Sequence, residues 1–354
     1  MVRMIRTSCV VDEGIAQGLH LGAQIYVSID ARPAIDLAIG HASPGVPMRS
    51  DMAMLYLSSG KPLTAAVVGQ LMEEGRLSAD DPVMRFIPAF AGGGKDAITV
   101  RHLLNHTAGL NKSLSSNWDI SDWDESVAKV CAYELPPTWQ VGRTAGYDAG
   151  ASWLILGDIL QRVTGTSFAL LMRRRLFDVL GTAGIAYAGS PDEAMAMKDR
   201  TSPMYDMQDG EPRQCPWSNP QRVHPPLPGA SARGRARDLG RFYEALMGGE
   251  ILAPATLSLL TSPSRGNIYD HTFRREMDWG LGFLVDNGPD APYGAGVLTR
   301  PGIFGHGGQQ SSLAFCDPSR RLVLVAIFNG LCGEVRHHKR LQALLQAVKE
   351  DLGL

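Results

Sequence analysis

The chain has 354 residues, of which 44% are hydrophobic and 20% are charged, and its formal net charge is −2. This composition is that of a globular protein and excludes a disordered chain, a coiled coil or a fibre. Such a small net charge provides no field that attracts a polyanion, so we expect no nucleic-acid partner. The five cysteines lack C-x-x-C spacing, which predicts free thiols and neither a disulfide framework nor a zinc site.

The N-terminal sequence MVRMIRTSCVVDEGIAQG contains two arginines but no apolar stretch of useful length before Asp12 and Glu13. We therefore expect no signal peptide. No segment approaches the ~20 apolar residues that a membrane-spanning helix needs. Together these features predict a cytoplasmic protein without a membrane partner.

In the first half of the chain the sequence predicts a hairpin and two helices. Residues 23–29 and 34–40 are β-prone and are joined by the turn-like DARP. A helix is expected from Ser58 to Gly75, with Pro62 tolerated in its first turn. Residues 152–165 form a second helical pattern, which ends at a glycine.

In the second half, strand patterns dominate. The basic run from Arg233 to Arg241 precedes an apolar helix pattern, so it is interpreted as a solvated helix start and not as a phosphate site. Strands are expected at residues 279–285, 311–317 and 321–329, followed by an amphipathic C-terminal helix.

Strands at both ends of the chain, with helices between them, predict one sheet built from both termini. The fold class is therefore α/β (α+β), with an inserted, mainly helical lobe. We expect residues 1–65 and 235–354 to form the α/β lobe and residues 66–234 to form the helical lobe.

Ser58 and Lys61 form an S-x-x-K pair that has the spacing of a catalytic couple. A serine hydroxyl needs a base within hydrogen-bond reach, and a lysine can be that base when burial or nearby positive charge lowers its pKa. Residues i and i+3 lie on one helix face, so both side chains can enter one pocket. Ser126 and Lys129 show the same spacing, but they lie in a charged stretch and are not expected to be catalytic.

Around Ser58 the sequence resembles the β-lactamase-related serine hydrolases, which include class C β-lactamases, penicillin-binding proteins, and related carboxylesterases and acyltransferases. The resemblance covers most of the chain, through MLYLSSGKPLTAAVVGQLMEEGRLSADDPVMRFIPAF, ITVRHLLNHTAGL, AGYDAGASWLILGDILQRVTG, DWGLGF and GHGGQQSSLAFCDPSRRLVLVAIFN in this order. It implies a β-lactamase/transpeptidase-like fold, with an antiparallel sheet flanked by helices. The active site is then expected in the cleft between the two lobes.

The resemblance places the family's second motif at Y147-D148-A149. Tyr147 is kept, and its phenol would pass protons between Ser58, Lys61 and the leaving group, with a pKa lowered by a nearby cation. Ala149 departs from the family pattern, because it lacks the amide or hydroxyl that contacts the substrate acyl amide. Little hydrolysis of β-lactams is therefore expected.

The family's third motif, K-T-G in β-lactamases, corresponds to His306, Gly307 and Gly308, which are expected to bind substrate. By position, the backbone N–H of Gln309 would complete an oxyanion hole together with the N–H of Ser58. A histidine in place of the lysine lowers the positive charge at neutral pH, so a substrate carboxylate would be held less firmly. His102 and His106 are spaced i, i+4, but they lack the glutamate of a zinc protease and are interpreted as structural.

These features predict a serine hydrolase that acts on esters or amides of a small molecule through an acyl-Ser58 intermediate, with no metal or organic cofactor. One alternative is an acyltransferase that passes the acyl group to an alcohol or amine. A second is a sensor that has kept the fold without turnover. The loops 111–123 and 204–226 are expected to shape the pocket, with the aromatic stretch from Trp118 to Trp123 shielding the intermediate from water.

Overall fold

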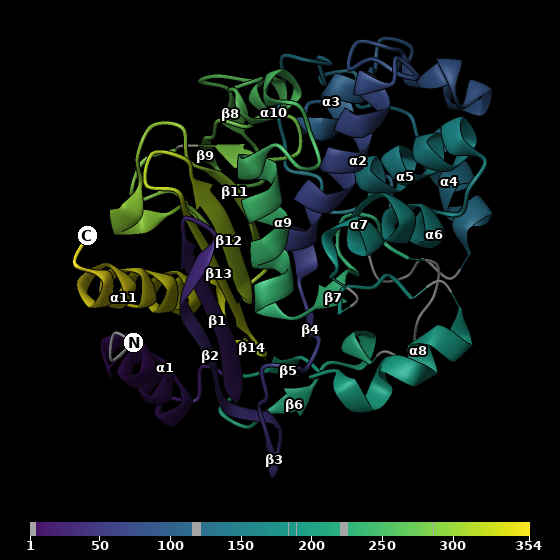
Figure 1. Cartoon of the computed structure of the whole chain (residues 1–354). Coiled ribbons are helices and arrows are strands. Elements are labelled where there is room, and N and C mark those ends of the chain that lie inside the picture. The colour runs from purple at the N-terminus through teal and green to yellow at the C-terminus, as the bar shows by residue number, and fades with distance from the viewer. Residues whose placement is uncertain (1–4, 115–121, 183, 189, 220–225, 286) are drawn as a thin grey trace.

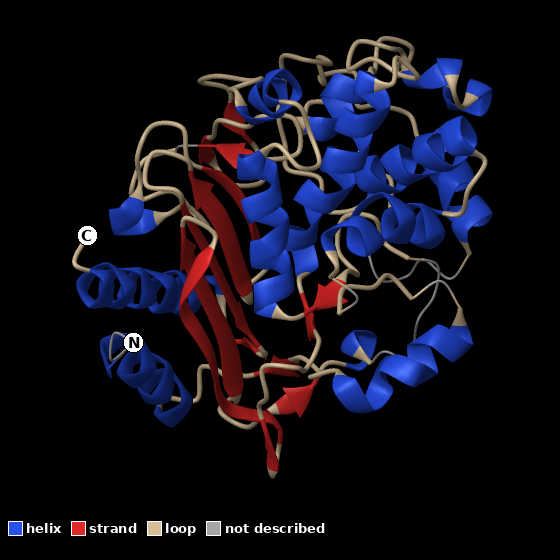
Figure 2. Ribbon diagram, in the orientation of Figure 1, coloured by secondary structure: helices blue, strands red, loops and turns tan. Residues whose placement is uncertain are grey.

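The structure is a computed structural model that describes residues 5–114, 122–182, 184–188, 190–219, 226–285 and 287–354. Its centre is a seven-stranded antiparallel sheet with strand order β10-β11-β12-β13-β1-β2-β3 (Figures 1 and 2). The strands are β1 (Gly22–Ile29), β2 (Arg32–Ser43), β3 (Val46–Pro47), β10 (Leu284–Val285), β11 (Phe304–Gly308), β12 (Ser312–Asp317) and β13 (Leu322–Phe328). Both ends of the chain thus contribute to one sheet, as the sequence predicts.

The expected N-terminal hairpin is confirmed. Ile29 pairs with Arg32, so the loop consists of Asp30 and Ala31. Both residues have positive φ, 52° and 57°. This conformation matches the right-handed twist of the flanking strands, which is why hairpins favour it in spite of the local strain.

The strand β13 explains why the apolar run 321–329 is continuous instead of alternating. Successive side chains of a strand point to opposite faces of the sheet. Leu322, Leu324 and Phe328 join the core on one face, whereas Val323 and Ile327 join the core on the other. Both faces of this central strand are covered, so every position is apolar.

Helices cover both faces of the sheet (Figure 1). On one face lie α1 (Ile5–Ala16) and α11 (Glu334–Leu352), which contact each other and bury Val11, Leu341, Leu344 and Val348 against the sheet. On the other face α9 (Ala236–Gly248) packs against β1, β12 and β13. The helix α9 lies between the sheet and the helical region.

The helical region occupies the side of α9 away from the sheet (Figure 2). The helix expected at residues 152–165 is confirmed as α5, and Gly165 caps it in the left-handed conformation with φ 67°. The helices here are α2 (Lys61–Glu73), α3 (Val100–Leu104), α4 (Trp123–Ala132), α5 (Ala151–Thr164), α6 (Phe168–Met172), α7 (Asp178–Leu180), α8 (Pro191–Met197) and α10 (Pro254–Thr261).

Short elements complete the chain. Four small strand pairs lie outside the main sheet: β14 with β5, β5 with β6, β8 with β9, and β4 with β7 beside the start of α2. These strands are β4 (Met54–Leu55), β5 (Tyr205–Asp206), β6 (Arg213–Gln214), β7 (Arg233–Gly234), β8 (Tyr269–Asp270), β9 (Arg275–Glu276) and β14 (Gly330–Leu331).

The prediction of a strand at residues 279–285 is largely wrong, because only Leu284 and Val285 enter the sheet, as β10. The preceding residues turn back on themselves. Gly280 N–H donates to the Phe283 carbonyl at 2.9 Å, and Gly282 has φ 83°, a conformation that glycine adopts without steric cost. The two glycines therefore form a turn where the apolar residues alone indicate a strand.

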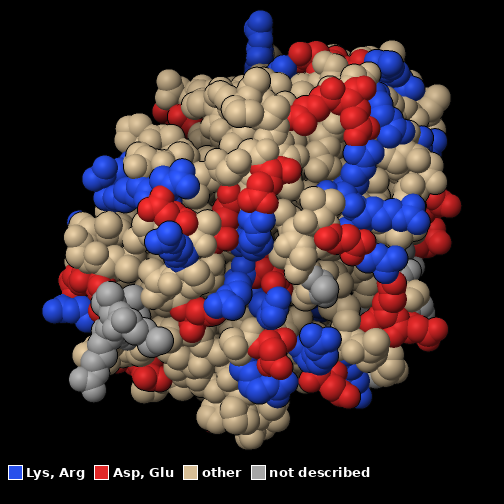
Figure 3. All heavy atoms as spheres, viewed as in Figure 1, with Lys and Arg blue, Asp and Glu red and all other residues tan. Residues whose placement is uncertain are grey.

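Acidic and basic side chains are intermixed over the face of the molecule in Figure 3. Most of the basic run from Arg233 to Arg241 begins α9, as expected, and three of its arginines are paired: Arg235 contacts Asp238, Arg237 contacts Asp36 and Arg241 contacts Glu250. The expectation of a solvated run is wrong for Arg233, which lies in β7 and is only 5% exposed. The five cysteines are all free, as expected. In the described part of the chain no single helix is long and apolar enough to span a membrane, and the bent pair 151–164 and 168–180 passes that test only in combination.

Candidate active site

Ser58 lies in a tight turn that precedes α2. Leu57 has φ 50°, an uncommon conformation for a bulky residue, and residues Leu57–Gly60 form a 3₁₀ turn before the α-helix begins at Lys61. The helix expected from Ser58 thus starts with this tighter turn. Side chains at i and i+3 are aligned in a 3₁₀ turn, so the predicted meeting of Ser58 and Lys61 is preserved, with Oγ and Nζ 3.0 Å apart.

Lys61 is fully buried, and three oxygens surround its amine. Besides the Ser58 Oγ, the Nζ contacts the carbonyls of Ala149 and Gly229, each at 2.9 Å. Burial lowers the pKa of Lys61 to about 7, while the charge of Asp148 acts in the opposite direction. A neutral amine has two N–H groups for the two carbonyls, which leaves its lone pair facing Ser58.

Tyr147 completes the contacts of Ser58, because its hydroxyl donates to the Ser58 Oγ at 2.8 Å. The expected lowering of its pKa is wrong. Burial raises the pKa of Tyr147, and the nearby carboxylates of Asp148 and Asp270 act in the same direction, although the bond to Ser58 opposes them. At neutral pH the phenol therefore holds its proton and can act as a donor.

The strand β11 brings the third predicted motif to the same place. Ser59 Oγ donates to the His306 carbonyl at 3.1 Å and contacts Ser312 Oγ on β12 at 2.9 Å, which ties the nucleophile turn to the sheet. A Cβ on Gly308 would lie 2.5 Å from the Tyr56 carbonyl oxygen, so only glycine permits this approach. Gln309 follows directly and lines the cavity beside Ser58.

His306 is buried and neutral. Its Nδ1 is 2.7 Å from the Gly307 carbonyl, to which it donates its proton. Burial, followed by the proximity of Lys61, lowers the pKa of His306 to about 3. The imidazole thus brings no positive charge at neutral pH, in agreement with the expectation from the sequence.

A cavity of about 830 Å³ opens at Ser58. Tyr147, His306, Gly307 and Gln309 line it beside the nucleophile, whereas Gly308 lies behind, against the nucleophile turn. The apolar wall comes from the segment before β11, and the rim comes from the first turns of α11. These lining residues are Phe273, Met277, Trp279, Leu284, Pro292 and Tyr293 for the wall, and Glu334, Val335, His338, Lys339 and Gln342 for the rim.

The pocket walls differ from those expected. In the described part of the chain, the loops 111–123 and 204–226 contribute no lining residue. Residues 115–121 and 220–225, including Trp118, lie outside the described residues. Trp123 begins α4 and donates its Nε1–H to Asp158 at 3.0 Å, so its side chain faces α5 and does not shield the cavity.

The second S-x-x-K pair is structural. Ser126 donates to the Asp122 carbonyl within the first turn of α4, and Lys129 forms an ion pair with Glu125 at 2.7 Å. The Lys129 side chain is 59% exposed, which leaves its amine hydrated and unsuited to act as a base.

His102 and His106 do not form a metal site. His102 closes a capping box with Thr99 at the start of α3, whereas His106 packs against Tyr147 with ring centroids 4.6 Å apart. Among the described residues, no group of three or more histidine, cysteine, aspartate or glutamate side chains is arranged to hold a metal ion.

Sequence patterns did not reveal the carbonyls that hold Lys61 or the carboxylate that orders the Tyr147 loop. The Asp148 side chain accepts from the N–H groups of Gly150, Ala151 and Ser152, so it caps α5 directly behind the site. No clear signal for this cap is present in the sequence, because Asp148 stands two residues before the N-cap residue Gly150, whereas a capping residue is expected immediately before the helical pattern.

Comparisons with known proteins show which proteins the chain resembles. The family model described as "Beta-lactamase" matches residues 10–349. Esterase EstB of Burkholderia gladioli is 27% identical over 340 residues, which cover 85% of each chain. Esterase/beta-lactamase LipL of Mycobacterium tuberculosis is 25% identical, covering 88% of this chain and 77% of its own. The solved structure of a family VIII carboxylesterase has a TM-score of 0.80 and 25% identity, and the match covers 97% of each chain.

Proposed function

Because the chain belongs to the beta-lactamase family and is an esterase-like serine hydrolase, we propose that it cleaves carboxylic esters of small molecules through an acyl-Ser58 intermediate. The observation that carries this proposal is the set of contacts at Ser58. Its Oγ lies 3.0 Å from a buried lysine amine and 2.8 Å from a tyrosine hydroxyl, at the wall of a cavity of about 830 Å³.

In the proposed mechanism, neutral Lys61 removes the proton from Ser58 as its Oγ attacks the ester carbonyl. The resulting oxyanion would accept from the backbone N–H groups of Ser58 and Gln309. Tyr147 gives its proton to the departing alcohol and is reprotonated from Lys61, so the acyl-enzyme forms with one alcohol released. Water then repeats the cycle in the same site and releases the free acid.

The cavity indicates the kind of ester. Phe273, Met277 and Trp279 present an apolar wall, which favours an aliphatic or aromatic acyl group over a sugar or a peptide. His306 and Gly307 are proposed to contact the substrate beside this wall. Because His306 is neutral, an uncharged substrate fits this site better than one that carries a carboxylate next to the scissile bond.

The experiment is a series of p-nitrophenyl esters with acyl chains of increasing length, each assayed with and without millimolar alcohols and amines. We expect hydrolysis that depends on Ser58, with kcat/KM rising as the chain lengthens, because each buried methylene contributes about 0.8 kcal/mol. Mass spectrometry of the products separates the free acid from acyl transfer. Predominant transfer to an alcohol or amine would make the protein an acyltransferase, and an unreactive Ser58 would make it a non-catalytic relative.

A further inference from the structure

The backbone around Tyr147 belongs to no helix or strand, so its polar groups need other partners. The backbone N–H groups of three consecutive residues, 146–148, donate to only two residues, His106 and Asp270. Gly146 donates to the His106 carbonyl at 3.1 Å, and Asp148 donates to His106 Nδ1 at 3.1 Å. Between them, Tyr147 donates to Asp270 Oδ1 at 3.2 Å.

The burial and backbone conformation of His106 allow it to accept hydrogen bonds from this loop. It is 1% exposed and has φ 62°, and this left-handed conformation turns its carbonyl and its ring toward the same loop. Because Nδ1 accepts a hydrogen bond, the ring is neutral and carries its proton on Nε2. Burial, together with the nearby charges of Arg265 and Lys61, holds the pKa of His106 well below its usual range, which keeps Nδ1 available as an acceptor.

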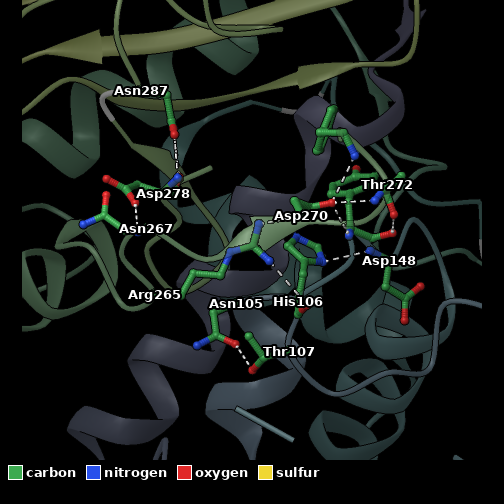
Figure 4. Close-up of polar contacts among 12 residues, drawn as sticks. Asn105, His106, Thr107, Asp148, Arg265, Asn267, Asp270, Thr272, Asp278 and Asn287 are labelled. Carbon is green, nitrogen blue, oxygen red and sulfur yellow. Dashed lines mark hydrogen bonds and ion pairs between the residues drawn. The ribbon is translucent and has the colours of Figure 1, made fainter. Parts of the chain in front are cut away.

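A buried ion pair fixes the other side of the loop (Figure 4). Asp270 Oδ1 also accepts from the N–H groups of Thr272 and Phe273, at 2.9 and 3.1 Å. Its Oδ2 accepts from Arg265 at 2.6 Å, and both side chains of this pair are at most 1% exposed. Arg265 also donates a hydrogen bond to the His106 carbonyl, which links the ion pair of Arg265 and Asp270 to His106.

We propose that His106 is a positioning residue for Tyr147: together with the Arg265 and Asp270 pair, it fixes the loop 146–148 so that the phenol stays on Ser58. This inference rests on the proposed function, in which Tyr147 transfers protons. Tyr147 lies on an irregular loop, where no ladder of backbone bonds fixes its place. A displacement of about 1 Å at such a group costs about 10²-fold in rate, so the amide contacts to His106 matter for turnover.

The test compares His106→Asn with His106→Gly. Asparagine and glycine both tolerate positive φ, and both lose the imidazole that packs on Tyr147. Only asparagine offers an oxygen close to the position of Nδ1, where it can accept from Asp148. The two variants therefore differ in the acceptor that the proposal requires. Each is made in the wild-type protein and in Tyr147→Phe, and the thermal midpoint is measured for all four.

The readouts are kcat and KM for a p-nitrophenyl ester and the rate at which a fluorophosphonate labels Ser58. In the wild-type background we expect His106→Gly to lower kcat by about 10²-fold with KM nearly unchanged, and His106→Asn to stay within about fivefold. In the Tyr147→Phe background the difference between the two variants should disappear, because the group being positioned is absent.

A role of His106 in stability alone would lower the thermal midpoint of His106→Gly while the ratio of kcat values persists without the Tyr147 hydroxyl. That result, or equal kcat values for the two variants, would overturn the positioning role.

Failure of the proposed function would give a different result. In that case Ser58 of the wild-type protein itself is not labelled and no ester is hydrolysed, and the positioning role is then lost with the function on which it rests.

Discussion

The chain contains two S-x-x-K pairs, Ser58 with Lys61 and Ser126 with Lys129, and comparing them tests whether a lysine must be buried to act as the base. Lys61 is fully buried and touches Ser58, whereas Lys129 is hydrated and paired with Glu125. We expect Ser58→Ala and Lys61→Met each to lower kcat for an ester substrate by several powers of ten, since the nucleophile or its base is removed. Ser126→Ala and Lys129→Met should leave kcat within about twofold. Comparable losses in the two pairs would refute the assignment.

The buried amine also determines a pH dependence. Lys61 accepts the Ser58 proton only when it is neutral, and its pKa of about 7 means that protonation removes the base below that pH. The value of kcat/KM should therefore rise roughly tenfold per pH unit up to about pH 7 and then level off.

Two groups that line the cavity beside Ser58, His306 and Tyr147, titrate outside that range. The pKa of His306 is held to about 3 by burial, and that of Tyr147 is raised. The measurement is a pH–rate profile with an ester that is stable over the range, after the enzyme has been shown to regain activity from each pH. A flat profile on the acid side of neutrality would exclude Lys61 as the base.

Single residues also show what the sequence can and cannot reveal about the site. Ser58 and Lys61 were predictable from their spacing together with the family resemblance, and Tyr147 was predictable from the resemblance alone. The carbonyls of Ala149 and Gly229 were not, since every residue carries a carbonyl and only the fold brings these two to Lys61. The pKa of Tyr147 was misjudged for a related reason: its burial, which the sequence does not show, raises the pKa in spite of the neighbouring Lys61.

At the scale of elements, β11 and the nucleophile turn form one unit. A Cβ on Gly308 would lie 2.3 Å from Ser312 Oγ and 2.5 Å from the Tyr56 carbonyl oxygen. Gly308→Ala should therefore push the strand away from Ser58, lowering kcat by about 10²-fold and stability by about 1–3 kcal/mol. The control is Gly248→Ala at the end of α9, where the nearest contact is an ordinary 3.4 Å to Glu250.

Both variants are assayed by ester hydrolysis and by urea unfolding. We expect Gly248→Ala to match the wild-type protein in kcat. If Gly308→Ala also keeps its full kcat, the close approach of β11 to the nucleophile turn has no catalytic meaning.

The elements that the sequence predicts well are those with a strong, continuous pattern. The strand β13 is apolar on both faces, and α5 carries an apolar stripe with a glycine stop. The helix α1 was missed because its buried residues, Thr7, Val11 and Gly14, include only one large apolar side chain. The segment 279–285 was misjudged because its glycines turn the chain before β10.

For the whole molecule, one apolar core connects the sheet to the helical region. Val325 and Ile327 from β13 belong to the same buried cluster as Leu160 of α5 and Phe168 of α6. A second cluster joins the opposite face of the sheet to α11, through residues such as Leu344. The strand β13 contributes to both clusters, so neither side of the molecule can unfold without exposing apolar surface on the other.

We therefore expect a single unfolding transition in urea, with the same midpoint by far-ultraviolet circular dichroism, tryptophan fluorescence and fluorophosphonate labelling of Ser58. Leu160→Ala and Leu344→Ala test this from opposite sides of the sheet, since both side chains are fully buried. Each should lower the free energy of unfolding by about 2–5 kcal/mol and shift all three probes together. If Leu344→Ala moved only the dichroism while the labelling of Ser58 kept its wild-type midpoint, the α11 side would unfold as a separate unit, and the shared core would not couple the two sides.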